Sequence, residues 1–175
     1  IKAQARHYDL VFCAHKDGAD KLKKDRVASA IWLPVACDPA IHKKLSLEKR
    51  FDLGFVGTEG KKSKRKAFLD IIKKKYPDSF IGRTEYTKMC EIYSASKIGL
   101  NYSINNDINM RMFEIMSCGT MLLTNYIRGN GFNETFENEK HLVVYKTKKD
   151  FLELTEYYLK NDAERERIAI SGYEH

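Results

Sequence analysis

An arginine and a glutamate three residues apart open a short helix that leads into an apolar strand. Arg111 and Glu114 lie in the segment 109–119, and the apolar residues 120–124 follow its final glycine. A helix N-terminus and an arginine attract a phosphate, and a carboxylate accepts hydrogen bonds from sugar hydroxyls. The pattern therefore suits a phosphorylated ribose. The structural alternative is an ion pair on the helix surface, which contributes only about 0.2–0.5 kcal/mol.

A glycine-containing turn and a cationic run precede this segment. Gly57 and Gly60 bracket a turn after an apolar stretch, and such a turn can let the backbone approach a phosphate. Five of the six residues 61–66 are cationic, at the point where the next helix should begin. Cations there oppose the helix dipole by about 0.3–1 kcal/mol each. An anion held among them would explain the run. The alternatives are an ordinary tight turn and a solvated lysine cluster.

Apolar, strand-like stretches alternate with helical patterns along the chain. This alternation is typical of a parallel, doubly wound sheet, in which ligands bind at the carboxyl ends of the strands. Gly82 and Tyr102 lie at two such ends, and the polar loop 105–109 follows the second. We expect strands at 9–14, 30–35, 52–57, 79–82, 97–102, 120–124 and 141–145, and helices at 17–25, 63–75, 86–95, 109–118, 148–160 and 162–172.

Composition limits the class of protein. Residues of apolar type make up 43% of the 175, enough for a real core, and no run is long enough to span a membrane. The four cysteines lie singly, which favours reduced, buried thiols of a cytosolic protein over disulfides or a zinc site. The formal charge of +7 calls for an anionic partner or a well-solvated surface. Nucleic acid and an anionic membrane are alternatives, but the lysines are spread along the chain.

The segment Arg111-x-Phe113-Glu114-x4-Gly119 resembles the donor-binding motif of group 1 glycosyltransferases of GT-B fold. Within this family, the sequence is most similar to the branch related to bacterial spore-maturation proteins. The resemblance extends over roughly residues 30–173 and includes further segments in the family's order: 51–57, 92–101, 141–145, 157–159 and 165–169.

The resemblance implies a two-part organisation. Residues 46–175 would form the Rossmann-like donor-binding domain, the C-terminal half of a GT-B fold. Residues 1–45 would be the tail of the N-terminal acceptor domain and the linker, with the stretch Leu33–Pro39 leading from one domain to the other. The helix at 163–173 would pack back towards this tail. His15 follows the first strand of the tail and is a weak candidate for a catalytic base facing the cleft.

The resemblance also implies an activity: transfer of a sugar from a nucleoside-diphosphate sugar to an unknown glycan, protein or lipid acceptor. Arg65 and Arg111 would stabilise the diphosphate without a metal or other cofactor. The donor would be held by Gly57, Lys61, Arg65, Gly82, Tyr102, Arg111, Phe113 and Glu114. The fragment would be inactive alone, and the enzyme cytoplasmic, with weak docking at the inner membrane surface.

One departure from the family pattern keeps a second class of function open. Many members have an acidic residue eight positions before the glutamate, where this chain has Asn106. The first carboxylate of the pair is therefore missing. This puts direct sugar contacts and the stereochemical outcome in question, and it leaves a non-catalytic nucleotide-binding module as the alternative.

Overall fold

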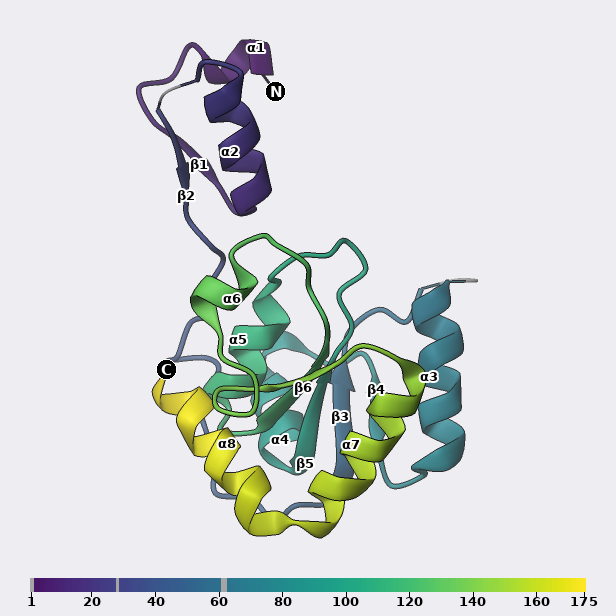
Figure 1. Ribbon diagram of the computed structural model, residues 1–175. Helices are drawn as coiled ribbons and strands as arrows, with labels where there is room; N and C mark the ends of the chain where they lie inside the picture. Colours follow the sequence, from purple (N-terminus) through teal and green to yellow (C-terminus); the bar gives the residue numbers. More distant parts are fainter. Residues whose placement is uncertain (1, 28, 61–62) are drawn as a thin grey trace.

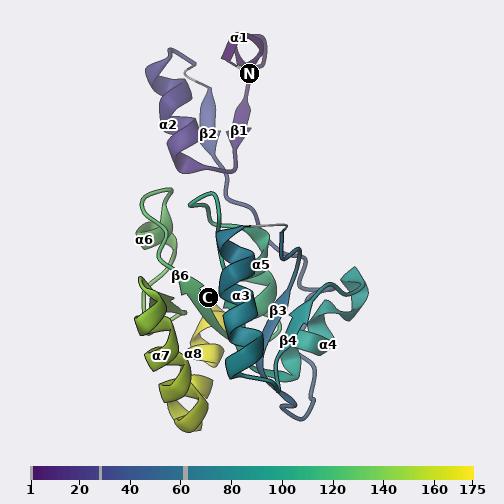
Figure 2. The same cartoon turned by 90° about the vertical axis from the view of Figure 1, so that its right-hand side faces the viewer.

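The computed structural model describes residues 2–27, 29–60 and 63–175. Strands and helices alternate along almost the whole chain (Figures 1 and 2). The elements are α1 (Lys2–Ala5), β1 (Val11–Cys13), α2 (Lys16–Lys24), β2 (Ala30–Trp32), β3 (Phe51–Val56), α3 (Lys64–Lys75), β4 (Phe80–Gly82), the 3-10 helix η1 (Tyr86–Lys88), α4 (Met89–Ser94), β5 (Ser96–Asn101), α5 (Met110–Ser117), β6 (Met121–Asn125), α6 (Phe132–Thr135), β7 (Val143–Tyr145), α7 (Lys148–Lys160) and α8 (Asp162–Glu174).

The main sheet has five parallel strands in the order β4-β3-β5-β6-β7. This confirms the expected α/β class with a doubly wound parallel sheet. All carboxyl ends lie on one edge of such a sheet. The order reverses between β3 and β5, because the chain adds β4 on one side of β3 and β5 on the other. Ligands bind at such a switch point in open α/β sheets.

Side chains alternate between the two faces of the sheet, and each face is covered by helices. Leu53 and Phe55 of β3 belong to the core under α3 and α7, whereas Val56 belongs to the core under α4 and α5. A Cβ atom at Gly99 of β5 would lie 2.3 Å from the Ile115 side chain. The glycine therefore lets α5 pack closely against β5, which brings the start of α5 to the carboxyl edge.

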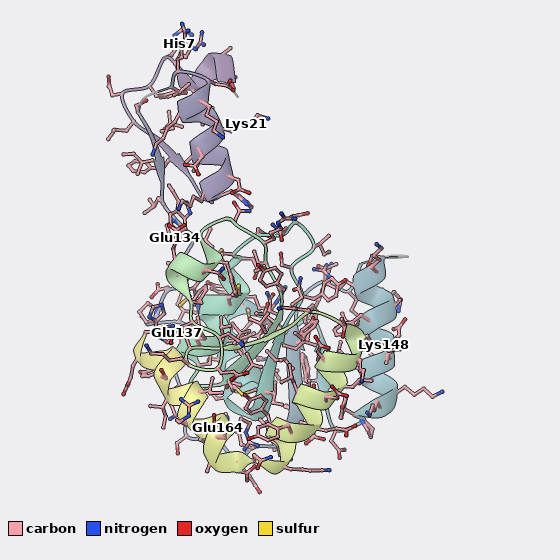
Figure 3. The ribbon with its side chains drawn as sticks, in the orientation of Figure 1. His7, Lys21, Glu134, Glu137, Lys148 and Glu164 are labelled. Carbon is pink, nitrogen blue, oxygen red and sulfur yellow. The ribbon has the colours of Figure 1, made fainter. Side chains whose placement is uncertain are left out.

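A smaller N-terminal unit, residues 2–32, consists of the parallel pair β1-β2 with α1 and α2. It lies beside α6 and the carboxyl edge of the main sheet (Figure 1). A salt bridge joins Lys16 to Glu134, which lies at this junction in Figure 3. The backbone N–H of Asp17 donates to Asn130 Oδ1 at 3.1 Å. The segment 33–50 connects the unit to β3.

The last helix was expected to pack back towards the N-terminal tail, and it does so only at its end. In α8, the side chains of Arg165, Ile168 and Ala169 are buried. The helix packs on strand β6 of the main sheet and on the helices α5 and α7. Only Gly172 and Tyr173 at its end, with the following His175, line a cavity together with Ala36, Cys37 and Pro39 of the connecting segment, residues 36–39. The cysteines are free, as expected, but Cys13 and Cys37 are half-buried instead of fully buried.

Candidate functional site

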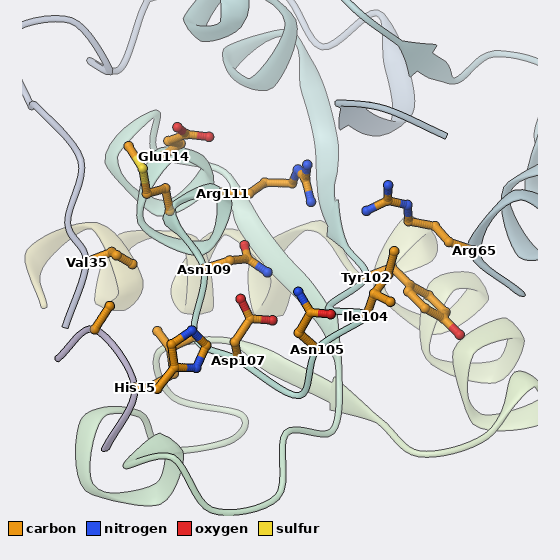
Figure 4. A pocket seen from close by; sticks show the side chains of 13 residues that line it. His15, Val35, Arg65, Tyr102, Ile104, Asn105, Asp107, Asn109, Arg111 and Glu114 are labelled. Carbon is orange, nitrogen blue, oxygen red and sulfur yellow. The ribbon is translucent and has the colours of Figure 1, made fainter. Parts of the chain in front are cut away.

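A cavity of about 590 Å³ lies at the carboxyl edge, between the N-terminal unit and the main sheet. Figure 4 shows its side chains converging from both parts of the chain. A shallower hollow of about 290 Å³ adjoins it and shares two of its residues, Arg111 and Glu114. The first cavity is lined by Ala14, His15, Val35, Arg65, Tyr102, Ile104, Asn105, Asp107, Ile108, Asn109, Met110, Arg111 and Glu114.

Arg111 lies at the switch point of the sheet. Its Nε donates to the carbonyl of Val56, at the end of β3, at 2.8 Å. Its Nη1 donates to Oδ1 of Asn101, at the end of β5, at 3.2 Å. The guanidinium packs over the ring of Phe55, with Cζ 4.7 Å from the ring centroid. These contacts fix the cation at the place where the topology predicts a ligand.

Gly57 gives the Arg111 guanidinium its space. Its φ of +154° is one that side-chain-bearing residues rarely adopt, and a Cβ atom here would lie 2.4 Å from Arg111 Nη2. Its backbone N–H donates to the carbonyl of Gly82 at 2.8 Å. The sequence predicts a turn whose backbone approaches a phosphate, but this N–H is already bonded and is not free for one. The glycine serves the site by leaving room for the arginine.

Arg65 approaches the same place from α3. Its Cζ lies 6.0 Å from the centroid of the Phe55 ring, and Figure 4 shows the Arg65 and Arg111 guanidinium groups pointing toward one another. Burial and the neighbouring Arg111 lower the pKa of Arg65 from its ordinary value. Neither arginine forms a salt bridge within the described ranges, and Arg65 Nε is buried without a hydrogen-bond partner there. Two facing cations that make no salt bridge with a carboxylate in these ranges form a site for an anion.

Glu114 is buried beside this pair, with only 6% of its surface exposed. Burial raises the pKa of its carboxyl group, whereas His42 and Arg111 act to lower it. In the described part of the chain, Glu114 makes no salt bridge with Arg111, so the alternative of a surface ion pair does not describe this structure. The Glu114 carboxyl group therefore remains able to accept hydrogen bonds from a bound ligand.

The four other predicted site residues do not all lie at the cavity. Tyr102 lines the cavity, with its ring 5.3 Å from that of Phe68. Gly82 lines neither hollow, but its neighbours Arg83 and Thr84 line the smaller one. The Phe113 side chain points away, lining the cavity at residues 36–39 with its ring 5.6 Å from that of Phe136. It therefore offers the site no side-chain contact. Lys61 lies outside the described residues.

The other described cations of this run, Lys64 and Lys66, lie outside the main cavity, which agrees for these two with the alternative of a solvated cluster. Lys66 pairs with Asp70 at 2.8 Å, and Lys64 lines a separate groove beside the cavity. Ser63 caps α3 by accepting the N–H of Lys66 at 3.1 Å. Of residues 63–66, only Arg65 lines the main cavity.

One site residue was missed from the sequence. Asn101 is fully buried and positions Arg111, while its own Nδ2 donates to Thr124 Oγ1 at 3.0 Å. The signal in the sequence was an asparagine that ends an apolar strand. Asp107 belongs to the polar loop 105–109 that the sequence places at this edge; it lines the cavity and accepts from Ser103 Oγ at 2.5 Å. Asn106, in contrast, points to the backbone of Arg128. The cavity therefore has a carboxylate one residue later than the family pattern places it.

The fold is that of the GT-B glycosyltransferases. HepE from Anabaena, in complex with UDP and glucose, superposes with a TM-score of 0.77 at 10% identity, over 98% of this chain and 60% of that chain. TarM from S. aureus, in a complex that includes UDP, gives 0.75 at 13% identity, over 99% and 41%. Sucrose-phosphate synthase from Thermosynechococcus elongatus gives 0.68 at 12% identity, over 99% and 54%. The chain thus spans about half the length of these proteins.

The chain belongs to the glycosyl transferase-like family, whose sequence model matches residues 40–175. It is therefore a glycosyltransferase-like domain. No curated protein matches the sequence at a significant level. None of the helices in the described ranges is long and apolar enough to cross a membrane. Within the same ranges, no three His, Cys, Asp or Glu side chains cluster in a way that could hold a metal ion.

Proposed function

We propose that this domain binds the nucleoside-diphosphate part of a sugar donor, in an enzyme that transfers the sugar to an acceptor. The observation that carries the proposal is the pair of facing guanidinium groups, Arg65 and Arg111, beside the buried Glu114 at the switch point. The diphosphate lies between the arginines, and the ribose hydroxyls donate to Glu114. The base occupies the smaller hollow, towards Arg83 and Tyr86.

The chemistry follows from charge. As the bond between the sugar and the phosphate breaks, negative charge grows on the leaving diphosphate. Arg65 and Arg111 are already in place to stabilise it, together with the backbone N–H groups that begin α5. The two cations supply the positive charge that a metal ion supplies in other transferases. In the larger cavity, Asp107 and Asn105 are placed to contact the sugar.

The whole enzyme is larger than this chain. We propose that residues 46–175 are the donor-binding domain and that 1–45 are the end of the acceptor domain with its linker. The chain would then be inactive alone, because most of the acceptor site is missing. We also propose membership of the spore-maturation-related branch, on the motif order, and a cytoplasmic enzyme that docks weakly at the inner membrane surface. The acceptor is a glycan, protein or lipid.

A non-catalytic nucleotide-binding module is the second candidate, favoured by the missing carboxylate at Asn106, whose side chain bonds the Arg128 backbone and does not line the cavity. An assay of the full-length protein separates the two. Turnover of a nucleotide sugar with release of nucleoside diphosphate supports the transferase. Binding without release supports the module.

Nucleoside diphosphates should stabilise the chain against heat. At ten times its dissociation constant, a specific ligand raises the free energy of unfolding by about 1.4 kcal/mol. We expect one or two members of a panel of ADP, CDP, GDP, TDP and UDP to raise Tm, with the matching monophosphate weaker because it places less charge between the arginines. Equal shifts for all diphosphates and for inorganic pyrophosphate would contradict a built nucleotide site.

A further inference from the structure

His42, in the connecting segment, is fully buried directly behind Glu114. None of its surface is exposed, and its Nε2 lies 3.8 Å from Glu114 Oε1. Neither ring nitrogen has a hydrogen-bond partner in the described part of the chain. An unpartnered buried polar group is costly and needs an explanation. The separation is too long for a hydrogen bond, but at this distance a protonated imidazole attracts a carboxylate.

The surroundings hold the imidazole in this position. Its ring meets that of Tyr86 edge-on, with centroids 4.8 Å apart, and Ser117 Oγ donates to the His42 backbone carbonyl. Glu114 faces the ring from α5 and Tyr86 faces it from η1. The titratable and charged groups around these two neighbours are Arg111 and Cys118 of the α5 region, and Cys37 and Asp38 of the connecting segment.

We propose that His42 is a positioning residue of the nucleotide site: it keeps Glu114 in the carboxylate form, oriented to accept the ribose hydroxyls. This inference rests on the proposed function. The Nε2–H donates to the carboxylate once a bound nucleotide draws the two groups together. The site needs such help, because burial favours the protonated acid, which accepts poorly from two hydroxyls. The connecting segment thereby contributes a residue to nucleotide affinity.

The test is the pH dependence of uridine diphosphate binding to the 175-residue chain, measured by calorimetry. If another nucleoside diphosphate of the panel raises Tm most, it is used in place of uridine diphosphate. In the unmodified chain, affinity should fall as the pH is lowered through the pKa of Glu114. In His42→Leu, the fall should begin about one pH unit higher, so that binding within that window is about tenfold weaker. His42→Gln keeps a donor of similar reach and should restore most of the affinity.

Two controls separate positioning from packing. Ser117→Ala removes the hydrogen bond to the same backbone carbonyl without touching the imidazole, and it should leave the pH profile unchanged. In a Glu114→Gln background, His42→Leu should cause no further loss of affinity. Should His42→Leu not fold, His42→Asn, a donor of shorter reach, should move the profile in the same direction.

Two results would overturn the inference. An unshifted pH profile in folded His42→Leu, or an equal loss in both Glu114 backgrounds, would mean that His42 only fills the core. Either result would leave the proposed nucleotide site intact. If Glu114→Gln itself has no effect on diphosphate binding, then the proposed ribose contact is wrong and the inference falls with it.

Discussion

Replacing Arg111 by alanine should reduce the turnover of the full-length protein by about 10²–10³-fold, with a smaller loss of diphosphate affinity. The reason is that charge on the leaving diphosphate is greatest in the transition state, where a preorganised cation has its largest effect. Steady-state kcat and calorimetric Kd values, measured side by side, check this split.

Arg65→Ala is the matched control for this prediction. Arg111 ties β3 to β5 through two hydrogen bonds, so its loss should also lower the free energy of unfolding. Within the described ranges Arg65 makes no side-chain hydrogen bond, and its Cζ lies 6.0 Å from the centroid of the Phe55 ring, so Arg65→Ala should reduce turnover without that cost. Unchanged kcat in both variants would remove the arginines from the mechanism.

Replacing Glu114 by alanine should weaken diphosphate binding by about 1–3 kcal/mol, which is roughly 5- to 150-fold. The variant loses the buried acceptor of the ribose hydroxyls. Calorimetry on the 175-residue chain measures the effect. Glu85→Ala is the control, because Glu85 is an exposed carboxylate that pairs with Lys88 at 3.3 Å. It changes net charge equally, so equal losses would indicate a non-specific effect of charge.

Most of the fold could be predicted from the sequence, because each strand of the main sheet is a short apolar run between helical patterns. The boundaries of β3, β5 and α7 agree with expectation to within a residue. The helices α1 and α6 were not predicted. Each has four residues, about one turn, which is too short for a helical period to appear in the pattern.

The site was predicted as far as local spacing reaches. Arg111 and Glu114 are three residues apart, so they share a face of α5. Phe113 is two residues from Arg111, about 200° around the helix, and it therefore faces the opposite side. The contacts of Arg111 with Val56 and of Glu114 with His42 join residues more than fifty positions apart, which no local pattern encodes.

The most direct measurement is a nuclear magnetic resonance titration of the 175-residue chain with the diphosphate that binds best. We predict that the largest shifts will occur at the Nε–H groups of Arg65 and Arg111 and at the backbone amides of 110–114, and that Glu114→Ala will reduce them at equal concentration. Shifts confined to Lys64, Lys146 and Lys148, which line the neighbouring groove, would place the anion elsewhere and contradict the assigned site.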